Sequence, residues 1–332
     1  MKILITGCAG FIGFHLAKRL CKMKHKVYGI DNLNNYYDIK IKKDRLKILK
    51  KNKLFSFTKV DLKNKKKLEK FFRRLKLDLI INLAAQAGVR YSIKFPQQYF
   101  DSNIIGFFNL IELARKFKIK KVISASTSSV YGKNKKMPFR EDERVDNIIQ
   151  FYAASKRSNE IFGDIYSKIY NMNFIFLRFF TVYGPWGRPD MSLASFVSNI
   201  IKRKKIDVFN YGNHQRDFTY IDDIVDGIIK SSQKKIKNKF EIFNLGNGKK
   251  IKLMQYIKII ENKLGIKAKI NFKKLQTGDV KGTLSNITKA KKELKYNPKI
   301  KIEEGIDNYI KWYKKYYKIQ WKYFIPSVVQ KI

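Results

Sequence analysis

Short apolar runs alternate with longer amphipathic segments along the first 180 residues of this chain. The runs have the length and the β-branched and aromatic content of buried strands. They predict strands over Lys2–Thr6, Lys26–Ile30, Phe55–Val60, Leu77–Leu83, Lys121–Ala125 and Asn173–Phe179. The amphipathic segments predict helices over Phe11–Cys21, Lys63–Leu75, Pro96–Phe117 and Tyr152–Tyr170. Because strands alternate with helices, the pattern predicts an α/β fold with a doubly wound parallel sheet.

Three glycines stand between the first predicted strand and the first predicted helix. Gly7, Gly10 and Gly13 have the spacing of a dinucleotide-binding loop, in which the turn, the approach to a pyrophosphate and the packing of helix on strand each need a glycine. Asp31 follows the second predicted strand, where a carboxylate binds an adenosine ribose and repels a 2′-phosphate. We therefore expect NAD rather than NADP. The alternative is a cofactor-free fold in which the glycines serve only turns and packing.

The alternation of strands and helices changes after Thr181. Turns rich in Gly and Asn, such as residues 211–213 and 245–248, follow with short helical patterns between them. We therefore expect a Rossmann-like, NAD-binding domain over residues 1–180, to which a segment around 215–245 returns. A smaller C-terminal substrate-binding lobe is expected over residues 181–332.

The charge of the chain is extreme. Its 332 residues include 72 Lys and Arg against 27 Asp and Glu, a formal net charge of +45. Such a charge suggests the hypothesis that the protein binds nucleic acid. This hypothesis predicts binding to a duplex that survives ~0.2 M salt. The lysines are spread along the chain, and Lys, Ile and Asn are abundant together, as an AT-rich genome would produce. We expect an anionic small molecule as partner and no nucleic acid.

The N-terminal stretch from Lys2 to Ala17 imitates the apolar part of a secretory signal. A cleavable signal has no need of glycines at three-residue intervals, and its removal would delete the first strand. No run reaches the ~18 to 20 apolar residues of a membrane span. Cys8 and Cys21 lack the spacing of a metal or redox site. We expect a cytoplasmic protein with neither a metal nor a membrane insertion.

A candidate hydride-transfer site combines a Tyr-Lys pair with a run of hydroxyls. Tyr152 and Lys156 lie four residues apart and therefore share a helix face. A free phenol with a pKa near ~10 is a poor base at neutral pH, and two nearby positive charges, an ammonium and a nicotinamide ring, would lower that pKa. An isolated pair would instead suit an amphipathic helix with Tyr inward and Lys reaching solvent. Residues 126–129, Ser-Thr-Ser-Ser, end a predicted strand at the edge where such sheets bind ligands.

Together these motifs resemble the extended short-chain dehydrogenase/reductases that act on nucleotide sugars, over nearly the whole chain. Three stretches closely resemble the UDP-glucuronate 4-epimerases: DNLNNYY (31–37), AAQAGVRYS (84–92) and RFFTVYGPWGRPDM (178–191). The resemblance implies NAD as cofactor, a UDP-sugar as substrate, with UDP-glucuronate favoured, and a homodimer. It also implies 4-epimerisation to UDP-galacturonate through a 4-keto intermediate, for polysaccharide or capsule precursors.

The resemblance also implies roles for individual residues. Thr127, Tyr152 and Lys156 would be catalytic. The cofactor-binding residues would be Gly7, Gly10, Phe11, Ile12, Gly13, Asp31, Asn32, Asp61, Leu62, Ala84, Ala85 and Gln86, together with Tyr152 and Lys156. The substrate-binding residues would be Val89, Arg90, Thr127, Ser128, Ser129, Thr181, Arg188, Arg216 and Asp279.

A 4-keto uronic acid can lose its carboxylate as carbon dioxide, so an epimerase must hold that group in place. The hydroxyls of residues 127–129 and Thr181 are neutral donors for it, and Arg188 or Arg90 offers a charge-assisted contact. Related dehydratases place an acidic residue within the segment 126–129, and this chain has none there. The serines could instead cap the following turn, and Arg188 could be a surface or dimer residue. A UDP-glucuronate decarboxylase, a UDP-hexose 4-epimerase and a non-catalytic NAD-binding regulator remain alternatives.

Overall fold

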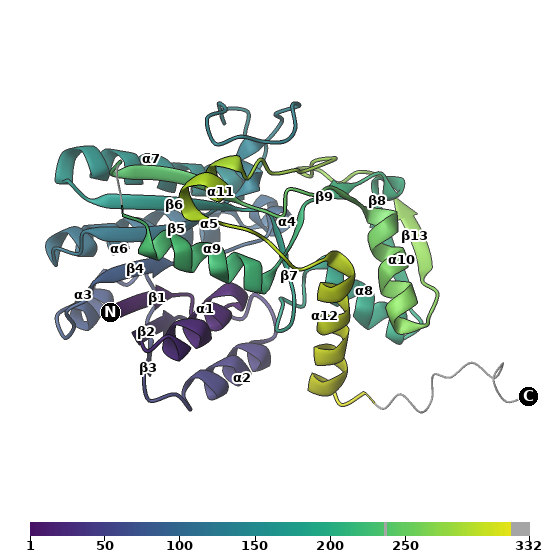
Figure 1. Cartoon of the computed structure of the whole chain (residues 1–332), viewed down its shortest axis with the longest axis horizontal. Coiled ribbons are helices and arrows are strands. Elements are labelled where there is room, and N and C mark those ends of the chain that lie inside the picture. The colour runs from purple at the N-terminus through teal and green to yellow at the C-terminus, as the bar shows by residue number, and fades with distance from the viewer. Residues whose placement is uncertain (236–237, 320–332) are drawn as a thin grey trace, which may run out of the picture.

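The computed structural model describes residues 1–235 and 238–319. Its centre is a seven-stranded sheet in the order β11-β6-β5-β4-β1-β2-β3, in which all neighbouring strands are parallel (Figure 1). The strands are β1 (Lys2–Thr6), β2 (Lys26–Asp31), β3 (Phe55–Lys59), β4 (Leu79–Asn82), β5 (Lys121–Thr127), β6 (Asn173–Phe179) and β11 (Phe240–Leu245). The predicted doubly wound parallel sheet is confirmed.

Helices cover both faces of the sheet because alternate strand residues point to opposite sides. In β1, Ile3 and Ile5 belong to the apolar core beneath α1, α2 and α9, whereas Leu4 belongs to the core beneath α3, α6 and α7. The helices on the first face are α1 (Phe11–Lys22), α2 (Ile39–Leu49) and α9 (Ile221–Gln233). Those on the second face are α3 (Lys65–Phe72), α6 (Gly106–Lys116) and α7 (Phe151–Tyr170).

The remaining elements form most of the smaller lobe, on the right in Figure 1. Its strands are short and pair two by two, with β8 and β13 parallel. They are β7 (Thr181–Tyr183), β8 (Lys205–Phe209), β9 (Gln215–Arg216), β10 (Phe218–Tyr220), β12 (Ile251–Lys252) and β13 (Lys269–Lys273). The helices are α8 (Ser192–Ile201), η3 (Asn210–Gly212), α10 (Leu253–Leu264) and α12 (Ile302–Tyr316), whereas α11 (Thr288–Leu294) returns to the main sheet beside β11 and α9. Residues 320–332 of the predicted lobe lie outside the described residues.

One predicted helix is wrong in its middle. The segment predicted as a single helix over Pro96–Phe117 consists of α5 (Pro96–Tyr99), a π-helical segment η1 (Phe100–Ile105) and α6. It follows a short helix, α4 (Val89–Lys94), that was not predicted. A further 3-10 turn, η2 (Ser128–Tyr131), continues directly from β5. The predicted returning segment contains α9 and β11, and β11 extends the main sheet next to β6.

Within the described residues, no helix combines the length and the apolar character needed to cross a lipid bilayer.

Candidate active site

The glycine loop passes close to the neighbouring strand end. Gly7 has φ +70°, and a Cβ there would lie 2.8 Å from the backbone nitrogen of Ala84. A Cβ at Gly13 would lie 2.2 Å from the Gly7 carbonyl oxygen. Gly10 precedes Phe11 and Ile12 at the start of α1 and contributes no side-chain cap to its first turn. The glycines thus keep the amide end of a long helix open to an anion, which fits the diphosphate of a dinucleotide.

Asp31 is the last residue of β2 and lies beside this loop. Its carboxylate accepts hydrogen bonds from the amides of Ala9 at 3.1 Å and Leu33 at 2.8 Å. Burial raises the pKa of Asp31, and these amides together with the Lys42 ammonium act against that rise. The carboxylate is therefore fixed where the sequence places a ribose acceptor.

The other adenine-side residues also come together. Asn32 donates from its amide to Asp61 Oδ2 at 3.0 Å, so the ends of β2 and β3 are joined by two of the predicted residues. Leu62 is buried, and its carbonyl accepts a hydrogen bond from Asn109 Nδ2 at 3.0 Å. Two segments that are separate in sequence thus form one wall of the candidate cofactor site.

Asn103, which sequence reasoning missed, holds the segment Ala84, Ala85 and Gln86. Its side chain accepts from the Gln86 amide at 2.8 Å and donates to the Gln86 carbonyl at 3.0 Å. It also donates to Ser155 Oγ at 2.9 Å, one helical turn beyond Tyr152. Asn103 is buried in the π-helical segment, and such segments occur frequently at functional sites. A polar amide within an apolar helix pattern was the signal for it.

The structure brings Tyr152 and Thr127 together. Tyr152 lies in the first turn of α7, with its hydroxyl close to the Thr127 side chain at the end of β5. Burial raises the pKa of Tyr152, whereas the Thr127 hydroxyl and the Arg188 charge lower it. Thr127 Oγ1 is also 3.2 Å from both the hydroxyl and the amide of Ser129, whereas Ser128 begins the 3-10 turn η2. The Thr127 hydroxyl therefore lies between the phenol of Tyr152 and Ser129 at the end of β5.

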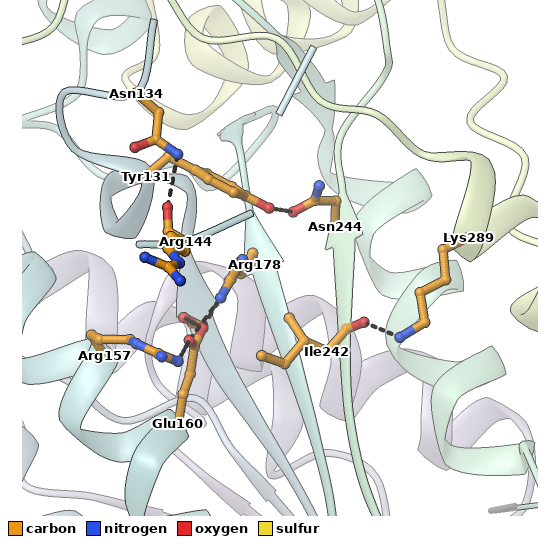
Figure 2. Close-up of polar contacts among 10 residues, drawn as sticks. Tyr131, Asn134, Arg144, Arg157, Glu160, Arg178, Ile242, Asn244 and Lys289 are labelled. Atoms are coloured by element: carbon orange, nitrogen blue, oxygen red, sulfur yellow. Dashed lines mark hydrogen bonds and ion pairs between the residues drawn. The ribbon is translucent and has the colours of Figure 1, made fainter. Parts of the chain in front are cut away.

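Lys156 lies one turn further along α7 and is 2% exposed. Burial lowers its pKa to about 8, and the carboxylate of Glu160 acts against this decrease. Glu160 is itself buried and forms an ion pair with Arg178 of β6, with Nη2 and Oε2 2.9 Å apart (Figure 2). Sequence reasoning missed this pair. The spacing of Lys156 and Glu160 was a signal for the carboxylate, but nothing local connected Glu160 to Arg178.

Arg188 lies close to Tyr152 but already has an anionic partner. Its Nε and Nη2 donate to the two carboxylate oxygens of Asp190, at 3.0 and 2.5 Å. Its guanidinium lies 5.5 Å from the centre of the Tyr36 ring, and the Tyr36 hydroxyl donates to Asp190 at 3.1 Å. Thr181, at the start of β7, lines the same pocket as Arg188. Two of the predicted carboxylate-binding residues thus lie together.

The loop that carries Arg188 is tied to the glycine loop. The fully buried Arg45 of α2 donates to the Ala9 carbonyl at 2.8 Å and to the Trp186 carbonyl at 2.5 Å. The Trp186 ring packs against the ring of Trp312 in α12, with centroids 5.3 Å apart. Arg45 therefore connects the candidate cofactor and sugar regions, and sequence reasoning missed it because its partners are distant in the chain.

Arg216 and Asp279, predicted for the nucleotide end of the substrate, form an ion pair with Nη2 and Oδ1 2.7 Å apart. Val89 lies beside the neighbouring Gly278, because a Cβ there would be 3.8 Å from Val89 Cγ1. Arg90 lies over the Phe209 ring at 5.2 Å from its centre. Arg90 thus contacts the small lobe, and of the two predicted arginines only Arg188 acts electrostatically on Tyr152.

Comparison with known proteins places the chain in a family. The profile of the GDP-mannose 4,6 dehydratase family matches residues 4–309. The chain belongs to this family. Among its relatives, CapI of Staphylococcus aureus is 46% identical over 96% of this chain and 100% of its own length. A UDP-glucuronate 4-epimerase of Thermodesulfobacterium geofontis is 44% identical over 94% of this chain and 95% of its own.

This member of the GDP-mannose 4,6 dehydratase family is also similar to a protein of known structure. The UDP-glucuronic acid 4-epimerase of Bacillus cereus, in complex with UDP-glucuronic acid and NAD, superimposes with a TM-score of 0.91. The two chains are 34% identical, and the similarity covers 96% of this chain and 100% of the other. The resemblance noted in the sequence is confirmed at the level of the whole chain.

Proposed function

We propose that this chain is an NAD-dependent epimerase that converts UDP-glucuronate to UDP-galacturonate through a 4-keto intermediate. The observation that carries this function is the placement of the Tyr152 phenol close to Thr127, one helical turn from the buried Lys156, with Arg188 and Thr181 nearby. The similarity to UDP-glucuronate 4-epimerases over nearly the whole chain supports it. We propose further that the product is a precursor for polysaccharide or capsule synthesis, a role that the name of the relative CapI supports.

The candidate cofactor residues fit NAD. The glycine loop and the start of α1 would hold the diphosphate, Asp31 and Asn32 the adenosine ribose, and Asp61 and Leu62 the adenine side. Ala84, Ala85 and Gln86 would line the cofactor further along. NAD supplies, when bound, an acceptor for the hydride from sugar C4 and the donor that returns it. Gly7, Gly10 and Gly13 allow the tight backbone packing of this loop, because a Cβ at each would lie 3.0 Å or less from another backbone atom of the chain.

The chain's own residues handle the proton. Tyr152, as a phenolate, takes the proton of the sugar 4-hydroxyl, and Thr127 orients the sugar oxygen through the hydroxyl that now contacts Tyr152. The Lys156 ammonium stabilises the phenolate. Once the 4-keto sugar has turned over about its phosphate linkage, the opposite face of C4 would receive the hydride, and Tyr152 returns the proton to the C4 oxygen. The UDP portion holds the donor meanwhile, through Arg216, Asp279, Val89 and Arg90.

Neutral surroundings for the sugar carboxylate support epimerisation over elimination. Residues 126–129 are Ser, Thr, Ser and Ser, so this segment offers no acidic group to assist loss of water. We assign the carboxylate to Arg188, Thr181 and the hydroxyls of Ser128 and Ser129, which would keep its bond to C5 out of line with the ketone π-system. On this view residues 181–332 mainly bind the nucleotide sugar, and residues 1–180, with the segment 215–245, bind NAD.

The test is turnover of UDP-glucuronate by the purified full chain, with products resolved by NMR. We expect UDP-galacturonate to form until equilibrium, without net NADH and without carbon dioxide. Release of carbon dioxide with a UDP-pentose would identify a decarboxylase instead. Turnover of UDP-glucose but not UDP-glucuronate would identify a hexose epimerase. Absence of any turnover, with NAD bound, would favour a regulator.

The same proposal includes a homodimer formed through α6 and α7. Ile161, Ile165 and Ile169 are exposed along one stripe of α7, and exposed Phe108 of α6 lies beside this stripe. A stripe of this kind can pack against its own copy about a two-fold axis. Ile165→Glu should give a monomer in analytical ultracentrifugation, whereas the control Met254→Glu, on exposed α10, should not. A dimeric Ile165→Glu variant would contradict this interface.

The cytoplasm remains the proposed location of the enzyme. Cys8 and Cys21 are both free thiols, which suits a reducing compartment.

A further inference from the structure

A buried carboxylate lies directly behind the candidate active site. Glu160 is 0% exposed, and four donors reach its two oxygens. Figure 2 shows the two arginines among these partners, Arg157 and Arg178. Ser126 Oγ donates at 2.6 Å, Arg178 donates from Nε and Nη2 at 2.9 Å each, and Arg157 Nη1 donates at 3.0 Å. With these partners in place, Glu160 stays ionised despite its burial, because they lower its pKa.

The network is built from the same elements as the catalytic residues. Glu160 follows Lys156 by one turn and Tyr152 by two turns on α7, so the three share a helix face. Ser126 immediately precedes Thr127 on β5, and Arg178 is its partner in register on β6. The carboxylate is thus held by β5, β6 and α7, one helical turn from Lys156.

Stability alone gives little reason for such an arrangement. A buried ion pair costs so much desolvation that apolar residues of similar volume often stabilise a protein equally well or better. Arg178 has a second role in packing, because its guanidinium lies 4.9 Å from the centre of the Tyr131 ring. The Tyr131 hydroxyl in turn donates to Asn244 of β11 at 2.7 Å. The pair therefore joins the site to the edge of the sheet, but neither contact requires a carboxylate beside Lys156.

The charge environment of Lys156, in contrast, does require a carboxylate beside it. Its neighbours on α7 are Tyr152 and Glu160, whereas β5 presents the neutral hydroxyls of residues 126 and 127. The positive groups nearby are Arg157 of α7 and Arg178 of β6, which both bind the Glu160 carboxylate, and Arg188, which lies near Tyr152. Tyr99 packs against the far edge of Tyr152, and burial raises its pKa, so it stays neutral at pH 7. Glu160 is therefore the negative group that keeps Lys156 protonated in its buried position.

We propose that Glu160 is a positioning residue whose buried carboxylate keeps the Lys156 ammonium charged and in place beside Tyr152. The proposal rests on the proposed function, because only hydride transfer through Tyr152 makes the charge of Lys156 essential. Arg178 and Ser126 then serve to hold the carboxylate ionised and correctly oriented.

Glu160→Gln in the full-length holoenzyme tests the proposal. Loss of the negative charge of Glu160, one helical turn from Lys156, should lower the pKa of Lys156 by about one to two units. Activity should therefore be lost at lower pH than in the wild type. The alkaline limb of the kcat–pH profile should move by the same amount. A ¹³C-lysine NMR titration gives the pKa of Lys156 independently of turnover, with its Cε resonance assigned by its loss in Lys156→Met.

Companion variants separate electrostatics from folding. Glu160→Gln leaves Arg178 unpaired and destabilises the protein, whereas the double variant Glu160→Gln/Arg178→Met removes both buried charges. The double variant should fold and still show the lowered Lys156 titration. Arg157→Gln retains the carboxylate and its ion pair with Arg178, so it should not lower the Lys156 titration.

The outcomes are distinct. An unchanged Lys156 titration in the folded double variant would overturn the proposal, and so would an equal decrease in Arg157→Gln. A decrease confined to the variants that lack the carboxylate supports it. If the wild type leaves UDP-glucuronate unchanged, the proposed function is wrong, and the NMR titration still decides whether Glu160 controls Lys156.

Discussion

Replacing Arg188 by Ala tests where the sugar carboxylate binds. The side chain is 18% exposed, and Asp190 accepts from its Nε and Nη2. Among the described residues, no hydrogen bond occupies Nη1, so the guanidinium can accept a second anion without losing Asp190. UDP-glucuronate offers that anion, whereas UDP-glucose does not. The two ligands therefore differ in the contact that Arg188→Ala removes.

The expected loss follows from the strength of one contact. A hydrogen bond to a charged group contributes about 1.5 to 3 kcal/mol, which corresponds to a loss of roughly 10- to 160-fold in affinity for UDP-glucuronate. Arg188 also lowers the pKa of Tyr152, so its removal should reduce turnover of any sugar to a similar extent. The contribution of the sugar carboxylate to binding is therefore measured by the ratio of the two affinities, and not by the turnover of either sugar alone.

Calorimetric titration of the NAD-loaded enzyme with each nucleotide sugar measures this ratio. Arg188→Lys is the matched control, because it retains the charge but loses the planar two-point geometry, and it should give an intermediate loss. An unchanged melting temperature in each variant excludes a general effect on folding. Equal losses for UDP-glucuronate and UDP-glucose would refute the reasoning and would place Arg188 on the diphosphate.

Three further outcomes are expected. Tyr152→Phe should retain fold and bound NAD but lose epimerisation by several orders of magnitude, since the phenyl ring has no proton to exchange, and activity within about tenfold of wild type would contradict its role. Asp31→Ala should weaken the preference for NAD over NADP in cofactor titrations, because it removes the carboxylate that repels a 2′-phosphate and leaves the Lys42 ammonium without that carboxylate. A wild type that prefers NADP would contradict the assignment. Thr181→Val combined with Ser128→Ala should release measurable carbon dioxide and NADH during turnover, unless the carboxylate lies elsewhere.

The sequence alone determined the fold class and the family, and it predicted Tyr152 and Lys156 as the catalytic pair. The glycine loop, Asp31 and the spacing of Tyr152 and Lys156 are local signals, because each depends on residues that lie close together or on a short repeat of strand and helix. The sheet confirms the predicted fold, and the family comparison confirms the resemblance. The roles of the individual site residues remain predictions that the proposed variants test.

Tertiary structure decided what surrounds that pair. Asn103 lies in the π-helical segment that interrupts a predicted continuous helix, and its partners lie 17 and 52 residues away. Glu160 meets Arg178 only where α7 crosses β6, and Arg216 meets Asp279 across 63 residues. A sequence pattern records which side chains are polar, but a buried polar group is specified by the partners that compensate its desolvation. Those partners are brought together only by the folded chain.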